Sequence, residues 1–264
     1  MKVLPIALVF LIALASFIPQ QKMAKNDFKK NFASLYDGLY MGKYEVSNSS
    51  YKQFLNAQKE LLSDANYKSL EVSQEVFTKQ DSKLAPFDKY YFEHSAYENY
   101  PVVGISYNAA NAYCDWLTAK YANELVKGKH IKFSLPTKAA WQFAGNSGDA
   151  AKQFSWGTGF TKNNRGKFLA NFKGSFDSNS GTDEYAKAIG AGKRINITSP
   201  VNSFFPSSAG VYNLCGNVAE MLDEEEIAAG GSFLSEVNDI TLNSFRKYDG
   251  ASLNIGFRVM ASLY

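Results

Sequence analysis

The chain has 264 residues, of which 45% are hydrophobic and 15% aromatic, so it can bury a sizeable core and lacks the composition of a disordered protein. Its 28 lysines and arginines nearly balance its 25 aspartates and glutamates, which gives a formal net charge of +3. Nucleic-acid-binding proteins usually concentrate basic residues on one face, and this sequence shows no such clustering. We therefore expect no nucleic-acid partner.

The first 20 residues have the pattern of a secretory signal peptide. Lys2 precedes an apolar run over residues 3–15 that ends in Ala-Leu-Ala. This run is shorter than the ~20 residues of a membrane-spanning helix, so we expect cleavage rather than an uncleaved anchor. The first cysteine is Cys114, so no cysteine follows the run for lipid attachment. We expect an exported protein of the periplasm, the outer membrane or the cell surface, associated with membranes only through partners.

Residues 21–37 are largely polar and basic, and we expect them to form a lead-in segment before the domain at 38–264. The domain opens with a predicted strand over 41–46, followed by Ser47 and Asn48, which are good helix N-cap residues. Apolar residues then recur at helical spacing over 51–62, which predicts an amphipathic helix.

Residues 63–99 show no periodicity and are predicted to be a surface insertion. A second strand is expected over 101–105, and Ser106 then caps a second helix. That helix places four apolar residues on one face: Ala109, Tyr113, Trp116 and Leu117. A third, short helix follows Thr137, its expected N-cap, and carries Trp141.

Residues 147–199 are dominated by glycine, asparagine, serine, lysine and aspartate and are predicted to be irregular. The last third consists of short apolar runs broken by glycines, at 210–212, 228–233 and 255–260. These runs predict short strands at the end of one mixed α+β domain.

The cysteines, the histidines and the acidic run do not by themselves indicate a functional site. Cys114 and Cys215 either form a disulfide or remain two buried thiols, and the sequence leaves both readings open. His94 and His130 are the two histidines and are expected at the surface. Contiguous carboxylates such as those at 223–226 are usually a solvated loop.

Six short landmarks occur in order between Met41 and Met260. They are residues 44–48; 101–106 with 113–117; 135–137 with Trp141; 156–157; 200–201 with 210–220; and 230–233 with 256–259. Each landmark alone is weak evidence for any family. Because all six occur in this order, the sequence resembles the formylglycine-generating-enzyme (sulfatase-modifying-factor) family. The resemblance implies an α+β, C-type-lectin-like fold that is loop-rich with little regular secondary structure.

Within that family, the Gly-Asn-Val-Ala-Glu sequence at 216–220 is similar to the gliding-motility and type IX secretion lipoproteins of Bacteroidetes. The chain departs from those lipoproteins because it lacks the cysteine that would follow the leader. This resemblance implies protein partners in an envelope or secretion complex.

The oxidases of the family carry two cysteines after a Gly-Gly-Ser turn and use them to bind copper. The matching positions here are Ser235 and Ile240, and Glu236 stands where the oxidases usually have a basic residue. Soft Cu(I) is held by thiolate sulfur and not by hydroxyl or alkyl groups, so we expect no copper. A sulfoxide-synthase branch needs three histidines from an added helical domain, and this chain has two histidines in all. We therefore predict that the chain has no catalytic residues and is a pseudoenzyme.

The resemblance also implies one structural calcium. In the family it is bound by the segment that matches Asn213–Glu220 here, with side-chain oxygens from Asn213 and Glu220 and carbonyl oxygens from Gly216 and Val218. All-oxygen ligation suits a hard cation, so the sequence predicts calcium at these four residues. The alternative is that Asn213 and Glu220 only stabilise turns. A second family calcium would begin at Asn171, but its later acidic ligand has no match here and it is not predicted.

Three functions follow from these observations. The first is a non-catalytic exported scaffold or binding component of a bacterial envelope machine of the type IX secretion or gliding-motility type. The second is a C-type-lectin-like module that binds a glycan or a protein through adaptable, tyrosine- and asparagine-rich loops. The third is an enzyme of unknown type on the same fold, which the sequence supports least.

Overall fold

The computed structural model describes residues 25–36, 38–177 and 196–264. The predicted signal peptide at 1–20 lies outside the described residues. The helices are α2 (Lys25–Asn31), α3 (Asn48–Gln58), α4 (Asp64–Lys68), α5 (Val76–Gln80), α6 (Ala85–Glu93), α7 (Tyr107–Lys120), α8 (Lys138–Asn146) and α9 (Lys173–Asp177). The strands are β1 (Phe32–Tyr36), β2 (Leu39–Gly42), β3 (Ile131–Ser134), β4 (Ala219–Met221), β5 (Ile227–Ala229), β6 (Phe245–Lys247), β7 (Ile255–Gly256) and β8 (Met260–Leu263). The predicted mixed α+β, loop-rich architecture is confirmed.

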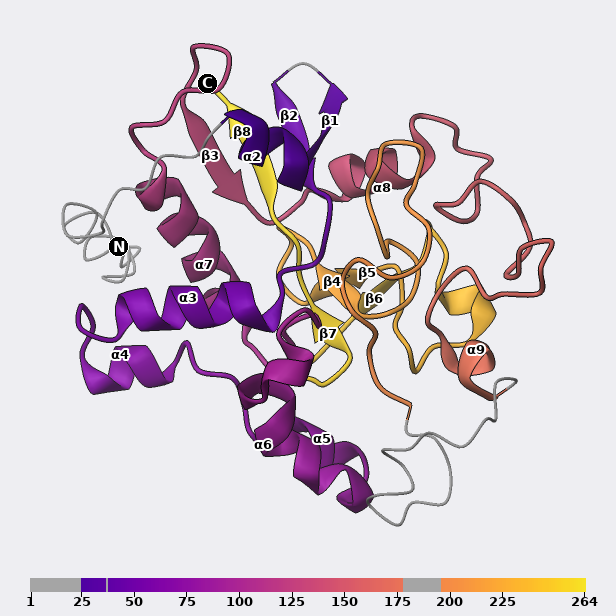
Figure 1. The fold of residues 1–264 in the computed structure, drawn as a ribbon, viewed down its shortest axis with the longest axis horizontal. Helices are drawn as coiled ribbons and strands as arrows, with labels where there is room; N and C mark the ends of the chain where they lie inside the picture. Colours follow the sequence, from indigo (N-terminus) through magenta and orange to yellow (C-terminus); the bar gives the residue numbers. More distant parts are fainter. Residues whose placement is uncertain (1–24, 37, 178–195) are drawn as a thin grey trace, which may run out of the picture.

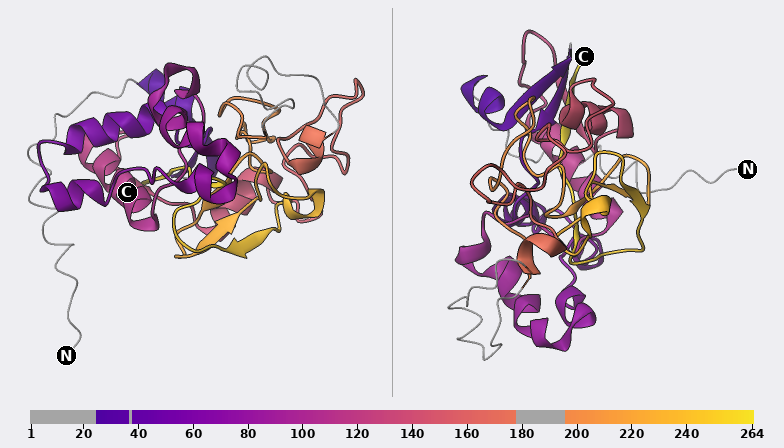
Figure 2. Two further views of the ribbon diagram at one scale, coloured as in Figure 1. Left: turned by 90° about the horizontal axis from the view of Figure 1, so that it is seen from below. Right: turned by 90° about the vertical axis from the view of Figure 1, so that its right-hand side faces the viewer.

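The described strands form two four-stranded sheets. The first has the order β1-β2-β8-β3 and is antiparallel, with the C-terminal strand β8 between β2 and β3. The second has the order β6-β5-β4-β7, in which β4 and β7 run parallel. The first sheet lies at one end of the molecule and helices α5 and α6 at the other, as Figures 1 and 2 show.

All three predicted helix caps are confirmed. The hydroxyl of Ser47 accepts a hydrogen bond from the Ser50 amide at 3.2 Å, at the start of α3. Ser106 caps α7 in the same way. At α8, Thr137 accepts from the Ala140 amide at 3.1 Å. Each hydroxyl satisfies an amide that has no partner within its own helix.

Two predicted strands are wrong. Residues 101–105 are extended but pair only at Pro101, which forms an isolated bridge with Ser47. Gly104, with φ 73°, turns the chain before a ladder can continue. Residues 210–212 also form no strand. Residues 101–105 are all buried, and so is Val211 in the second run, but burial alone does not produce a strand.

The segment at 63–99 contains α4, α5 and α6 rather than the predicted irregular insertion. Phe77, Phe87 and Tyr91 are buried together in a cluster that also contains Val103 and Phe233 of the main domain. The Tyr91 hydroxyl donates to the Pro101 carbonyl at 2.7 Å, which ties this segment to the main domain. The helices are too short, five residues in α4 and five in α5, to show a periodic pattern.

The predicted lead-in at 21–37 also contains structure. Its strand β1 pairs with β2, and its helix α2 buries Phe28. The Phe28 ring lies 4.8 Å from that of Phe32 and 5.1 Å from that of Tyr40. The folded domain therefore begins before residue 38.

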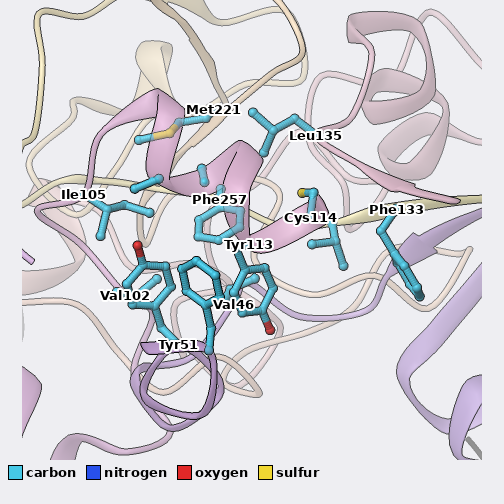
Figure 3. Packing of buried hydrophobic residues seen from close by; sticks show 14 of the residues in the cluster. Val46, Tyr51, Val102, Ile105, Tyr113, Cys114, Phe133, Leu135, Met221 and Phe257 are labelled. Carbon is cyan, nitrogen blue, oxygen red and sulfur yellow. The ribbon is translucent and has the colours of Figure 1, made fainter. Parts of the chain in front are cut away.

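The main core lies between α3, α7 and the central strands (Figure 3). Tyr51, Tyr113 and Phe257 meet there, and the rings of Tyr51 and Tyr113 stack with centroids 5.9 Å apart. Cys114 belongs to this cluster and Cys215 to a second one, and both are free and buried. The structure thus has two buried thiols and no disulfide between them.

The polar residues that were predicted to lie at the surface do lie there. His94 and His130 are exposed, and so is the acidic run at 223–226. No helix in the described part of the chain has the length and apolar character needed to cross a membrane.

Candidate functional site

The first candidate site is a cavity of about 260 Å³ beside β5 and β6. It contains Ser235, one of the two positions predicted to match the oxidase cysteines. Its lining consists of Ala219, Ala228, Gly231, Ser232, Ser235, Arg246, Lys247, Tyr248, Asp249, Ser252, Asn254 and Ile255. We refer to this cavity as the serine cleft.

A glycine turn after β5 shapes the serine cleft. Gly230 and Gly231 have φ values of 83° and 65°, which favour glycine. A Cβ atom on Gly231 would lie 2.2 Å from the Asp239 carbonyl oxygen, so no larger residue fits there. The turn brings Ser232 and Ser235 together, with the Ser232 amide donating to the Ser235 hydroxyl at 2.9 Å.

Among the described residues, no general base forms a hydrogen bond with Ser235. Its hydroxyl contacts the amide of Ser232 and, at 3.4 Å, the Ser232 hydroxyl. Asn254 donates to Ser232 at 3.3 Å and accepts from Ser252 at 2.6 Å. A serine nucleophile needs an adjacent base, so these contacts supply hydrogen bonding but no activated nucleophile.

Ile240 lies in the core. Its side chain is fully buried in the cluster that also holds Trp141 and Leu242, and it does not line the serine cleft. The only two cysteines of the chain are likewise elsewhere, and burial raises the pKa of the Cys215 thiol to about 12 and that of Cys114 further still. The serine cleft therefore contains no thiolate that could hold copper.

Tyr248 is a cleft residue that the sequence did not single out. Its hydroxyl is buried and has no hydrogen-bond partner among the described residues. Burial raises the pKa of Tyr248 to about 12, so the phenol stays protonated at neutral pH and can donate to a ligand. Asn254 was also missed, although it stands two residues before the landmark at 256–259.

The second candidate site is a set of five buried polar side chains, which we call the ionic cluster. Its members are Glu45, Asn213, Asn217, Glu220 and Arg258. Glu45 follows β2, Glu220 lies in β4, and Arg258 lies between β7 and β8. Asn213 and Asn217 have φ values of 54° and 64° in the turn that leads to β4. The cluster joins three parts of the chain that are distant in sequence.

Arg258 is the central cation of the ionic cluster. It forms an ion pair with Glu220 through Nε, at 2.5 Å, and through a terminal guanidinium nitrogen. The other terminal nitrogen donates to the Gly42 carbonyl at 3.0 Å, and a further bond reaches the Tyr212 carbonyl at 2.8 Å. Trp141 completes the site by donating its indole N–H to Glu220 at 2.8 Å.

Glu45 is the second buried carboxylate. It accepts from the Asn217 amide nitrogen at 2.8 Å and from the Asn213 amide nitrogen at 3.0 Å. Burial raises the pKa of Glu45 to about 8, against the opposing attraction of Arg258. A carboxyl group with this pKa is largely protonated at neutral pH, so the ionised groups of the cluster are the Glu220 carboxylate and the Arg258 guanidinium, whose charges balance.

The predicted calcium ligands lie on one continuous loop that ends in β4. Glu220 accepts three hydrogen bonds from Arg258 and Trp141, and a carboxylate has about four lone-pair sites, so one remains. Asn213 uses its amide nitrogen, and its side-chain oxygen accepts no hydrogen bond from the described residues. The oxygen donors are of the kind that calcium prefers, although the Arg258 guanidinium already balances the charge of Glu220. The described residues contain no group of three or more histidine, cysteine, aspartate or glutamate side chains suited to a metal.

The comparisons with known proteins agree with this architecture. Residues 20–263 match the family model described as "Sulfatase-modifying factor enzyme 1-like domain". The formylglycine-generating enzyme of Mus musculus is 30% identical over 205 residues, which cover 70% of this chain and 48% of that protein. The inactive C-alpha-formylglycine-generating enzyme 2 of Bos taurus is 29% identical over 175 residues, covering 60% and 49%. The chain spans about half the length of these relatives.

Solved structures support the fold alone. PvdO from Pseudomonas aeruginosa superposes with a TM-score of 0.53 at 18% identity, over 85% of this chain and 80% of PvdO. CarF superposes with a TM-score of 0.51 at 21% identity, over 86% and 87%. Because the family model covers nearly the whole described structure, the chain belongs to the sulfatase-modifying factor enzyme 1-like domain family.

Proposed function

We propose that this chain is a non-catalytic exported scaffold or binding component of a bacterial envelope machine, of the type IX secretion or gliding-motility type. The observation that carries the proposal is the chemistry of the serine cleft. Ser235 stands there without a base, Ile240 is buried in the core, and both thiols lie outside the cleft. A chain of this kind can bind but cannot oxidise through copper.

The relatives are compatible with this proposal. They include formylglycine-generating enzymes and also proteins named inactive C-alpha-formylglycine-generating enzyme 2, so the family contains both kinds. The signal-like N-terminus and the Gly-Asn-Val-Ala-Glu sequence motivate the envelope assignment.

The test is genetic complementation in the native host. Deletion of the gene should impair secretion or gliding, and the wild-type chain should restore it. Ser235→Ala should restore it equally, since the proposal gives the serine no catalytic role. The same envelope proteins should co-purify with both chains in a fixed ratio. A Ser235→Ala chain that folds and still binds those proteins but fails to complement would overturn the non-catalytic reading.

A second candidate function is the C-type-lectin-like binding of a ligand. A specific observation favours it, namely a cavity of about 680 Å³ with an aromatic wall on the side of α7. Ligand pockets typically have this size and this lining of aromatic groups with a few polar ones.

We also propose that calcium bound by Asn213, Gly216, Val218 and Glu220 has a structural role. The loop that contains these residues connects to Glu45 and Arg258 through the ionic cluster. A cation bound there would stabilise the folded state by mass action.

A further inference from the structure

The larger cavity of the molecule lies between α3, α7 and the first sheet and has a volume of about 680 Å³. Its lining shares no residue with that of the serine cleft. Val46, Tyr113 and Phe133 line it, and Figure 3 shows these three side chains among the buried residues of the main core. We call it the aromatic cavity.

Six rings form its wall: Phe32, Tyr44, Tyr113, Trp116, Tyr121 and Phe133. Five of them form two groups of contacting rings. In the first group, the Tyr113 and Trp116 centroids are 5.5 Å apart, and the second group contains Phe32, Tyr121 and Phe133. The Tyr121 and Phe133 centroids are 6.1 Å apart. Aromatic rings in a cavity lining suit a ring-shaped ligand that presents C–H groups to them.

The wall contains an unsatisfied donor. Trp116 is 5% exposed, and its indole N–H has no hydrogen-bond partner among the described residues. Buried donors in native proteins are nearly always paired, so an unpaired one in a cavity wall calls for an explanation. A hydrogen-bond acceptor on a bound ligand would pair with this N–H.

A partly buried lysine lies over the same ring. The Lys120 Nζ atom is 4.6 Å from the Trp116 centroid and 5.5 Å from the Tyr121 centroid. Burial lowers the pKa of Lys120, and none of the described carboxylates forms an ion pair with it. Lys30 is a second lysine in the lining. The only acidic lining residue, Glu45, is already engaged with Asn213 and Asn217.

The remaining lining offers neutral hydrogen-bonding groups. Gln53, Asn99 and Asn202 are exposed, and their side-chain amides make no hydrogen bond with the described residues. An amide both donates and accepts, which is what a ligand with several hydroxyl groups requires. The cavity thus combines flat apolar surface, amides and unpaired positive charge.

We propose that the aromatic cavity binds a saccharide that carries a carboxylate group. The sugar ring packs against the aromatic wall, the carboxylate pairs with Lys120, and ring hydroxyls bond to the amides and to the Trp116 N–H. This inference rests on the ligand-binding function proposed above and gives it a substrate class. The saccharide proposal does not depend on the chemistry of the serine cleft, because the two cavities share no lining residue.

The experiment is a titration of the full folded chain, by calorimetry, with an oligosaccharide of galacturonic acid and with the matched oligosaccharide of galactose. The acidic sugar should bind about tenfold tighter than the neutral one, as expected for one charge-assisted bond. Lys120→Gln should remove this preference and leave the affinity for the neutral sugar unchanged. Lys120→Arg should keep it, which separates loss of charge from loss of fold.

Two further variants complete the design. Trp116→Phe keeps a ring but removes the N–H donor, so it should weaken both sugars. Lys162→Gln is the matched control, because Lys162 also lies over a ring, that of Phe168 at 4.3 Å, but outside the cavity. It should change neither affinity.

Equal affinity for the two sugars, or an unchanged preference in Lys120→Gln, would overturn the assignment of the carboxylate. Absence of any binding at concentrations on the order of 10 mM would overturn the saccharide proposal itself. Neither result bears on the non-catalytic function, which the complementation and oxidation assays test separately.

Discussion

The Arg258 guanidinium and the Glu220 carboxylate form an ion pair in which both side chains have an exposed fraction of 0%. Through its other bonds Arg258 also holds the carbonyls of Gly42 and Tyr212. The pair therefore joins both sheets to the loop before β4. Loss of one partner leaves an uncompensated buried charge, which is more costly than the loss of an exposed pair.

We expect Glu220→Gln to lower the free energy of unfolding by about 3–5 kcal/mol. Urea denaturation of the purified chain measures this change. The matched control is the exposed pair of Lys79 and Glu75, whose side chains are 70% and 75% exposed. Lys79→Gln should change stability by less than about 0.5 kcal/mol. Equal effects of the two substitutions would show that the buried pair has no special role.

We predict that the folded chain binds calcium. If it binds at Asn213–Glu220, elemental analysis should find it in the purified chain, and chelation should lower the melting temperature. The loss corresponds to about 2.7 kcal/mol at a free calcium concentration a hundredfold above the dissociation constant. Glu220→Ala should abolish the difference between calcium and chelator, whereas Asp223→Asn in the exposed acidic run should preserve it. A metal-free chain with identical melting in both buffers would refute the site.

The two thiols give a chemical prediction. Burial raises the pKa of Cys114 and Cys215, so both remain protonated and should resist alkylation at pH 8 in the folded chain. After denaturation without reductant, mass spectrometry should show two alkylated cysteines. A chain that needs reductant before it is alkylated would contain a disulfide, contrary to the structure.

The raised pKa values of the two thiols also predict that the free energy of unfolding depends on pH in the alkaline range. An acid whose pKa is raised on folding keeps its proton longer in the folded state than in the unfolded state. The free energy of unfolding should therefore fall as the pH rises above the ordinary thiol pKa of 9 towards about 12. Cys215→Ala should reduce the slope in urea titrations across this range, and an unchanged slope would contradict the assignment.

The sequence predicted those parts of the fold that depend on nearby residues. Ser47, Ser106 and Thr137 each bond to an amide three residues later, so a local pattern is sufficient to recognise them. The strand predicted at 101–105 failed because apolar character reports burial and not pairing. The short helices α4 and α5 were missed because five residues do not establish a period.

The sites were predicted less completely. Glu45 is 168 residues from Asn213, and no local pattern indicates that their side chains meet. Glu220 was predicted from the family resemblance as a metal ligand, whereas its contact with Arg258 became evident only in the structure. The aromatic cavity combines residues from α3, α7 and the first sheet, and only the tertiary fold brings these together.

The proposed non-catalytic function requires that this chain does not oxidise cysteine. The most direct measurement incubates the purified chain with a sulfatase-type cysteine peptide, copper and oxygen, and an active formylglycine-generating enzyme serves as positive control. Mass spectrometry should show unmodified cysteine with this chain and the aldehyde with the control. Aldehyde above the level without protein, absent when the chain is heat-inactivated, would contradict the account.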